Sequence, residues 1–317
     1  MTTSVLRLGT RASALATSQS DWVADRLRAA GHEVELVLVR TEGDVSRRSL
    51  SEIGGTGVFA SALRDALHEG RIDLAVHSLK DIPTSPEPGL TIAAVPERED
   101  PRDVLVARDG LTLAQLPAGS RLGTGSPRRA AQLATARPDL EIRDIRGNVG
   151  TRIGYVRDGE LDAVVLARAG LARLDRLDEV TDTLPLTTML PAPGQGALAV
   201  ECRTDRPELA QVLVSTLEHG PTRAAVTAER AVLARLEAGC TAPVAALATP
   251  EDSSELSLEV FVALDRPQRH RATGSSADPV ALGHAVAEHV LTRPAPLATV
   301  ADGSAAAVGA FEPEPDL

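Results

Sequence analysis

Short apolar runs alternate with longer amphipathic runs along most of the chain. Apolar runs of about four to eight residues are typical of strands, and longer runs with a helical period are typical of helices. In the first part of the chain they predict strands over Val5–Leu8, Glu33–Val39 and Ile72–Leu79, with helices over Ser13–Ala30 and Val58–Glu69. This order favours an α/β domain with a mostly parallel sheet and helices on both faces.

The same alternation begins again after Pro101. Its predicted strands and helices follow one another over Arg121–Gly123, Pro127–Ala136, Glu141–Ile145, Val149–Arg157 and Asp162–Ala167. The segment Arg7-Leu8-Gly9-Thr10 recurs as Arg121-Leu122-Gly123-Thr124, and each copy leads from a strand into a helix. We therefore predict two similar doubly wound domains with a ligand cleft between them.

Two proline-containing segments, Pro96–Pro101 and Pro191–Gly196, are predicted hinges between these halves, because a strand-like run over Ala197–Cys202 follows the second. A third unit begins near Pro221, with predicted elements over Thr222–Ala238, Leu256–Leu264 and Pro279–Leu291. The predicted domains are residues 1–98 with 195–216, residues 99–194, and a small α/β domain over 217–300. Residues 301–317, rich in alanine, proline and acids, are predicted to form a poorly ordered tail.

Composition limits the possible partners. A net charge of −11 and an aromatic content of 2% argue against a protein that binds nucleic acid or anionic lipid. No apolar run reaches the ~20 residues that cross a bilayer, and Met1–Thr10 has no signal core, so we expect a cytoplasmic protein. Cys202 and Cys240 make no disulfide framework, and we predict no metal site from the spacing of possible ligands.

Lys80 is the only lysine among 33 basic residues, and it stands beside Asp81 at the end of a predicted strand. Open α/β sheets bind ligands at this end of their strands. A lysine offers a compact ammonium for an anion, and an aspartate can stabilise a cation or accept a proton. The alternatives are a chance lysine and an aspartate that only caps the turn before Pro83.

Residues 121–152 contain seven arginines but only three acids. Ser126 and Pro127 are the residue types of an N-cap and a first helical position, where free N–H groups and the helix dipole favour anions. About half of the seven arginines should be solvated or paired with local acids. The others, placed by helix starts, are predicted to bind carboxylates or phosphates: Arg128, Arg129, Arg146 and Arg152.

The two cysteines suggest different roles. Cys240 follows Gly239, a residue type that ends helices such as the one predicted over Thr222–Ala238. The negative end of a helix does not lower a thiol pKa, so Cys240 is a poor candidate for a fast nucleophile but could react once and stay bonded. Cys202 lies on an apolar strand face and is predicted to be a core residue.

In combination, these motifs resemble the hydroxymethylbilane synthase family, also called the porphobilinogen deaminases. They occur in the family order over roughly residues 5–245. The matching segments are Leu8–Ser13, Ala75–Pro83, Glu97–Asp103, Ser126–Arg129, Arg146–Arg152, Pro193–Ala197, Ala228–Arg230 and Glu237–Cys240.

The resemblance implies two domains similar to type II periplasmic binding proteins and a small third α/β domain. It implies a monomeric enzyme of tetrapyrrole (heme) biosynthesis that deaminates porphobilinogen and joins four units head to tail into hydroxymethylbilane, releasing ammonia. It also implies a dipyrromethane cofactor attached to Cys240 through a thioether. Asp81 matches the catalytic aspartate, and we expect a buried carboxylate there that stabilises the cation left by ammonia and holds pyrrole N–H groups.

The resemblance further assigns cationic and polar partners to the acetate and propionate groups of each pyrrole. Besides Asp81 and Cys240, the residues implied for the cofactor are Lys80, Ser126, Arg128, Arg129 and Arg146. The residues implied for the substrate are Arg11, Ser13, Arg152, Arg173 and Gln195.

The chain departs from the family pattern at two places. Its glycine-rich segment Gly43–Gly57, a possible lid or a plain surface connection, has Glu52 and lacks the lysines of many relatives; Arg47 or Arg48 could replace them. Gly125 stands where relatives often have serine.

Three other functions fit parts of the pattern. A non-catalytic protein that binds or senses small anions would use the same cleft, but it would not explain Cys240 in its motif. A cysteine-dependent acyl transferase would need a histidine such as His77 or His219 to activate Cys240. An inactive paralogue is the third alternative, because of the changes in the glycine-rich segment.

Overall fold

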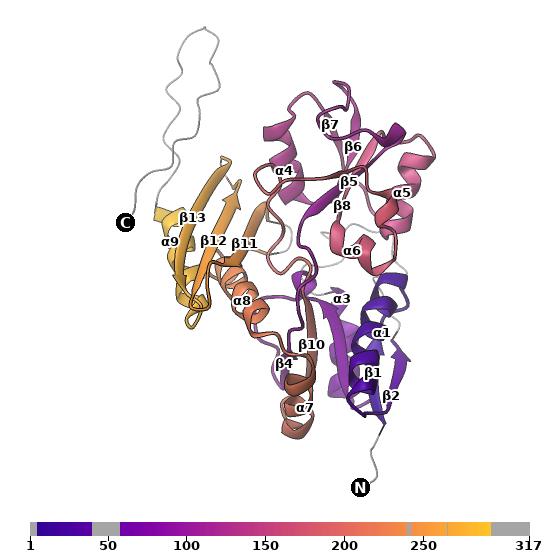
Figure 1. Ribbon diagram of the computed structural model, residues 1–317, viewed down its shortest axis with the longest axis vertical. Helices are drawn as coiled ribbons and strands as arrows, with labels where there is room; N and C mark the ends of the chain where they lie inside the picture. Colours follow the sequence, from indigo (N-terminus) through magenta and orange to yellow (C-terminus); the bar gives the residue numbers. More distant parts are fainter. Residues whose placement is uncertain (1–4, 40–57, 240–241, 265, 293–317) are drawn as a thin grey trace.

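The computed structural model describes residues 5–39, 58–239, 242–264 and 266–292. Three sheets define three α/β domains (Figure 1). The five strands of the first sheet lie in the order β2-β1-β3-β10-β4, with β2, β1 and β3 parallel and β10 antiparallel to both its neighbours. They are β1 Leu6–Thr10, β2 Val34–Leu38, β3 Leu74–Ser78, β4 Leu90–Ala94 and β10 Leu198–Arg203.

Helices cover both faces of this first sheet. On one face, α1 (Ala14–Ala29) and α7 (Pro207–Leu217) pack against side chains that include Leu8, Val76 and Cys202. On the other face, α3 (Val58–His68) packs against a smaller apolar cluster. The prediction that Cys202 is a core residue is confirmed, because its side chain is fully buried.

The second sheet repeats this arrangement in the order β7-β6-β8-β5-β9, again with three parallel strands followed by an antiparallel one. Its helix α4 covers one face, and α5 and α6 cover the other. The strands are β5 Asp103–Ala107, β6 Arg121–Gly123, β7 Glu141–Arg143, β8 Ala163–Ala167 and β9 Asp182–Thr183. The helices are α4 Pro127–Ala136, α5 Val149–Arg157 and α6 Arg168–Arg173.

The repeated tetrapeptide occupies the same position in both domains, in β1 and in β6. In the first copy, a side chain on Gly9 would begin 2.3 Å from Ile72, so glycine lets the strand pack closely there. The carboxylate of the next residue, Asp73, accepts a hydrogen bond of 2.9 Å from the backbone N–H of Arg7. The second copy has the same contacts, made by Gly123, Leu161, Asp162 and Arg121. The prediction of two similar halves is therefore confirmed.

The chain crosses between these two domains twice, as the hinge prediction required. Residues 96–101 connect β4 to β5, and residues 191–196 connect β9 to β10. The two crossing segments contact each other: the N–H of Glu99 donates to the carbonyl of Gly196 over 3.3 Å. Each crossing also supplies the antiparallel strand that follows it, β5 to the second sheet and β10 to the first.

The third domain is an antiparallel sheet, β11-β12-β13, covered by α8 and α9. Its elements are β11 Val244–Pro250, β12 Glu255–Val262, β13 Gln268–Ser275, α8 Gly220–Arg235 and α9 Pro279–Thr292. It packs against the second domain through a small apolar cluster that includes Leu190 and Phe261. The expected α/β architecture of two similar domains and a small third one is thus confirmed.

The predicted end of the helix before Cys240 was wrong. Helix α8 ends at Arg235, and Glu237, with φ of 51° in the left-handed region, ends the helix in place of the predicted Gly239. The N–H of Ala238 then donates to the carbonyl of Leu233 over 3.0 Å, which closes the helix end. Cys240 itself, the segment Gly43–Gly57 and the predicted tail over residues 301–317 lie outside the described residues. Within the described ranges, no helix is both long and apolar enough to cross a membrane.

Candidate active site

The turn that carries Lys80 and Asp81 directly follows β3, as predicted. The chain leaves β3 at Ser78 and makes one 3₁₀ turn over Leu79–Asp81. Leu79 is buried and its N–H donates to the carbonyl of Ala197 over 3.0 Å, so the turn is fixed to the start of β10. Lys80 is half-buried and Asp81 is exposed. The expectation of a buried Asp81 was therefore wrong, because Asp81 lies beyond the end of the sheet.

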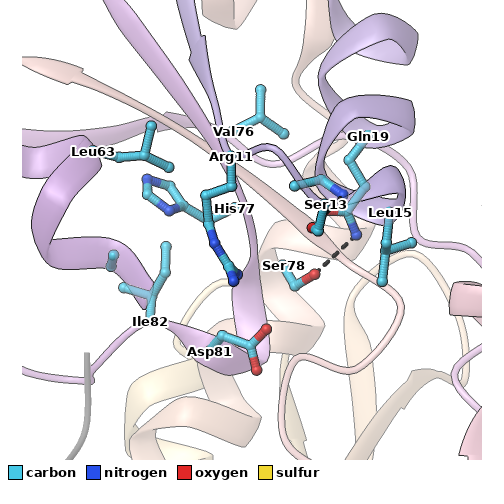
Figure 2. A pocket seen from close by; sticks show the side chains of 12 residues that line it. Arg11, Ser13, Leu15, Gln19, Leu63, Val76, His77, Ser78, Asp81 and Ile82 are labelled. Carbon is cyan, nitrogen blue, oxygen red and sulfur yellow. Dashed lines mark hydrogen bonds between the residues drawn. The ribbon is translucent and has the colours of Figure 1, made fainter. Parts of the chain in front are cut away.

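A pocket of about 470 Å³, including its open mouth, lies at this end of the first sheet. Its apolar wall includes Leu63 and Ile82, and its polar wall includes Arg11, Ser13 and Asp81. Figure 2 shows the Arg11 side chain extending towards the Asp81 carboxylate. The pocket thus presents a carboxylate, a guanidinium and a hydroxyl beside an apolar surface, which suits a ring with charged substituents.

Ser13 and Ser126 hold equivalent positions at the starts of α1 and α4. The side-chain oxygen of Ser13 accepts from the N–H of Ala16 over 3.3 Å, and that of Ser126 accepts from the N–H of Arg129 over 3.4 Å. Both are therefore N-caps, as the residue types indicated. The two helix starts bring the adjoining residues to the ends of their sheets nearest the cleft, which is why Arg11 and Arg129 lie near the site.

Arg128 and Arg129, which were predicted to bind anions, are both buried against a carboxylate of the chain itself. Their guanidinium groups share the carboxylate of Asp103, at 2.8 Å and 2.7 Å, and Asp103 is fully buried. Burial disfavours the ionised carboxylate, but the two guanidinium charges outweigh it and hold the pKa of Asp103 well below its usual range. Two cations share one anion, so the group keeps a positive charge that can attract a further carboxylate.

Gln195 links Lys80 to this buried group. Its amide nitrogen donates to Asp103 over 2.8 Å and to the carbonyl of Pro101 over 2.6 Å, while its amide oxygen accepts from the Lys80 ammonium over 3.3 Å. Burial lowers the pKa of Lys80 to about 8; the charge of Asp81 opposes this effect, and that of Arg129 adds to it. The ammonium therefore faces a partly desolvated site from which it would gain by pairing with a carboxylate.

Two further predicted arginines, Arg152 and Arg173, are largely desolvated. Burial lowers the pKa of Arg152 to about 10, and the charges of Arg129 and Arg146 lower it further while that of Asp81 opposes them. Burial also lowers the pKa of Arg173 to about 10, and its guanidinium donates to the carbonyl of Gly196 over 2.6 Å. Arg152 of the second domain therefore lies within range of the charge of Asp81 in the first.

Three of the seven arginines were not assigned to the cleft. Each pairs with a nearby acid: Arg121 with Asp162, Arg137 with Asp139, and Arg143 with Glu141.

The donor groups of the cleft fit a ligand with several carboxylates. Among the described residues, the buried Nε atoms of Arg128, Arg129 and Arg146 have no hydrogen-bond partner. Buried donors are ordinarily satisfied, so these three N–H groups are left to pair with an acceptor that is not part of the described chain. A dipyrromethane bears acetate and propionate groups, which have the acceptor chemistry that these donors require. In the part of the chain that is described, no group of three or more His, Cys, Asp or Glu side chains could hold a metal ion.

Sequence reasoning missed the roles of Asp103 and Glu229. Both lie in motifs that pointed to the family, yet neither was assigned a contact. Asp103 opens β5, whose five residues are all buried, and an acid at the edge of such an apolar run signals a buried partner. Glu229 is also fully buried and lies inside α8. An acid among the apolar residues of a helix likewise signals a buried partner.

Solved structures similar to this chain include ligand-binding proteins. The methionine binding protein MetQ is 12% identical, with a TM-score of 0.44 over 67% of this chain and 89% of that one. A methionine-binding lipoprotein of Bacillus subtilis is also 12% identical, with a TM-score of 0.42 over 68% and 90% of the two chains. Likeness at this level carries no argument about function.

Comparisons of sequence are far closer. A family described as porphobilinogen deaminase, dipyromethane cofactor binding domain, matches residues 6–211, and its C-terminal domain matches residues 223–292. Porphobilinogen deaminase 1 of Streptomyces coelicolor is 62% identical over 78% of this chain and 79% of the relative. The porphobilinogen deaminase of Thermobifida fusca is 58% identical over 86% of both chains. That of Mycobacteroides abscessus is 54% identical over 90% of this chain and 97% of the relative. The chain therefore belongs to the porphobilinogen deaminase family of transferases, whose first domains bind a dipyrromethane cofactor.

Proposed function

We propose that this chain is an active porphobilinogen deaminase that joins four porphobilinogen molecules into hydroxymethylbilane and releases ammonia. The observation that carries the proposal is the position of Asp81 opposite cationic side chains from both large domains, inside a chain that belongs to this family. A protein that only bound small anions would not require a carboxylate at the centre of a cationic cleft.

Asp81 is the proposed catalytic residue. Departure of ammonia from porphobilinogen leaves positive charge on a methylene-pyrrole unit, and a nearby carboxylate lowers the energy of that charge. The neighbouring Arg11 and Ser13 line the same pocket and would orient the substrate carboxylates. Exposure of Asp81 to the open pocket mouth lets a substrate reach it, and the arriving pyrroles would displace water from the carboxylate.

Cys240 is the proposed attachment point of the dipyrromethane, which when bound would supply the pyrrole carbon on which the chain grows. Lys80 and Ser126 would hold its carboxylates, together with Arg128, Arg129 and Arg146. Four further residues would hold the substrate and the growing chain: Arg11, Ser13, Arg152 and Arg173. Gln195 contacts Lys80 and Asp103 and would act on the substrate through the lysine ammonium.

We also propose the domain bounds, the oligomeric state, the location and the partners of the protein. The domains are residues 1–98 with 195–216, residues 99–194 and residues 217–300. The enzyme works as a monomer in the cytoplasm and acts on porphobilinogen without nucleic acid or a membrane as partner. The net charge of −11 supports the proposal that neither nucleic acid nor a membrane is a partner, because both are negatively charged.

Intact mass tests the function and the anchor together. Purified protein should carry a covalent increment of two pyrrole units, and porphobilinogen should add further single units. Cys240→Ser should remove every increment, while the control Cys202→Ala should keep them, because Cys202 is fully buried in the first domain. A wild-type chain that stays unmodified with porphobilinogen would refute the proposed activity and favour an anion-binding protein or an inactive paralogue.

Assembly of the cofactor should depend on the charge of Lys80. The pKa of about 8 means that the ammonium is charged below that pH and neutral above it. The rate at which apoprotein gains mass from porphobilinogen should therefore fall as the pH rises through about 8. Lys80→Arg, which stays charged to higher pH, should be slower overall but lack this step. An unchanged step near pH 8 in Lys80→Arg would assign the titration to another group.

A further inference from the structure

A single buried carboxylate in the third domain bonds to both crossing segments. Glu229 lies on α8 and is fully buried. One of its oxygens accepts from the Arg98 guanidinium over 2.6 Å and from the N–H of Ala248 over 2.9 Å. The other accepts from the same guanidinium over 3.1 Å and from the N–H of Gly194 over 2.6 Å. Arg98 belongs to the first crossing, Gly194 to the second, and Ala248 to β11.

These contacts continue to the turn that carries Lys80. Gly194 has φ of 74°, and a side chain there would begin 3.4 Å from the backbone nitrogen of Lys80. Arg98 donates through Nε to the carbonyl of Gln195 over 2.6 Å, and the Gln195 side chain accepts from the Lys80 ammonium. The Glu229 carboxylate is therefore joined to the Lys80 ammonium by three successive hydrogen bonds, by way of Arg98 and Gln195.

The next residue of α8 holds the other side of the same turn. The guanidinium of Arg230 donates to the carbonyl of Ile82 over 2.9 Å and to that of Pro83 over 2.7 Å. The turn over Leu79–Asp81 is thus held from both sides by adjacent residues of a helix in another domain. Replacing a buried ion pair by apolar side chains often leaves the free energy of unfolding unchanged. Stability alone therefore does not explain why Glu229 and Arg98 form a buried ion pair.

We propose that Glu229 is a positioning residue for the deaminase reaction: by holding Gly194 and Arg98 it fixes where the Lys80 ammonium lies relative to Asp81. Glu229 does not contact the substrate and acts only through the two crossing segments. The inference rests on the function proposed above, because it requires Lys80 and Asp81 to belong to one working site.

The test compares Glu229→Gln with Glu288→Gln. Glu288 is exposed on α9 and pairs with Arg235 of α8, so the control makes the same chemical change in the same domain away from the crossings. The value to measure is kcat per molecule that carries covalent cofactor, with the loaded fraction counted by intact mass. Glu229→Gln should lower this value by roughly tenfold to a hundredfold, the cost of a small misplacement in an active site. Glu288→Gln should keep it.

A second variant separates positioning from folding. Glu229→Gln leaves the Arg98 charge without its anion and should lower the melting temperature, whereas Arg98→Met with Glu229→Gln removes that charge and should restore it. The double variant should nevertheless stay slow, since Gly194 still lacks its carboxylate acceptor. Normal kcat per loaded molecule in either variant would overturn the positioning role. A wild-type protein without deaminase activity would instead overturn the proposed function, and this inference with it.

Discussion

Asp81→Ala should lower kcat by about 10²–10³-fold, the effect seen when one electrostatic stabiliser of a reacting centre is removed. Its melting temperature should stay close to that of the wild type, because Asp81 is exposed and substitutions at such positions change the free energy of unfolding by about 0.5 kcal/mol or less. Steady-state production of hydroxymethylbilane and thermal unfolding measure the two quantities. The cofactor should remain attached, which intact mass can check.

Asp65→Ala is the matched control for this prediction. Asp65 is exposed on α3 of the same domain and does not line the pocket. It should keep both turnover and melting temperature. If Asp81→Ala formed hydroxymethylbilane at close to the wild-type rate, Asp81 would be only a turn residue before Pro83, and another group would have to stabilise the developing charge.

Arg128→Leu should be among the most destabilising substitutions in the molecule, lowering the free energy of unfolding by about 3–5 kcal/mol. Arg128 is buried against Asp103 and also donates to the carbonyl of Leu190, so a leucine there removes donors that cannot be replaced by water. The remaining Arg129 keeps Asp103 ionised but cannot occupy the position of its neighbour. Equilibrium denaturation measures this loss, and assembly of the cofactor should fail with it.

Arg146→Leu provides the contrast. The Arg146 guanidinium is half-buried and lies 3.7 Å from the exposed Asp144, an arrangement that contributes little to stability. The unfolding free energy should therefore change by about 0.5 kcal/mol or less, while assembly of the cofactor or addition of substrate becomes slower. Equal loss of stability in the two variants would contradict the contrast between Arg128, buried against Asp103, and Arg146, half-buried beside an exposed acid.

The elements with a clear period were predictable from the sequence. The helices α4 and α5 begin and end at the predicted residues, because Ser126 and Asn148 cap them and their apolar positions recur at helical spacing. The strands β4 and β5 were missed: each is short, and β5 is buried on both faces, so neither shows the alternation of a half-exposed strand. The antiparallel pairing of β10 with β3 and β4 could not be predicted from the local sequence pattern, because it depends on which domain the chain returns to.

For the candidate residues, the positions along their strands and helices were predictable, but their burial was not. Spacing placed Lys80, Asp81 and the arginines at element ends, and the structure brings these ends together at one cleft. Whether a charged side chain faces the cleft or the interior depends on a partner distant in sequence, as Asp103 shows for Arg128 and Arg129. The exposure of Asp81 also depends on tertiary structure, because the turn that carries it lies beyond the end of β3.

Strand β10 returns from the second domain to the first sheet, and this return sets the order in which the two large domains fold during synthesis. All five strands of the second sheet lie between residues 103 and 183, so that domain can complete its sheet as one continuous piece of chain. The first sheet cannot, because β3 and β4 are both paired with β10, which begins only at Leu198. Until the ribosome has released β10, the inner edges of β3 and β4 have no partner, and unpaired strand edges are prone to aggregate. The first domain to be translated is therefore the second to be finished, and a chain cut short before Leu198 would keep one complete sheet and one divided sheet.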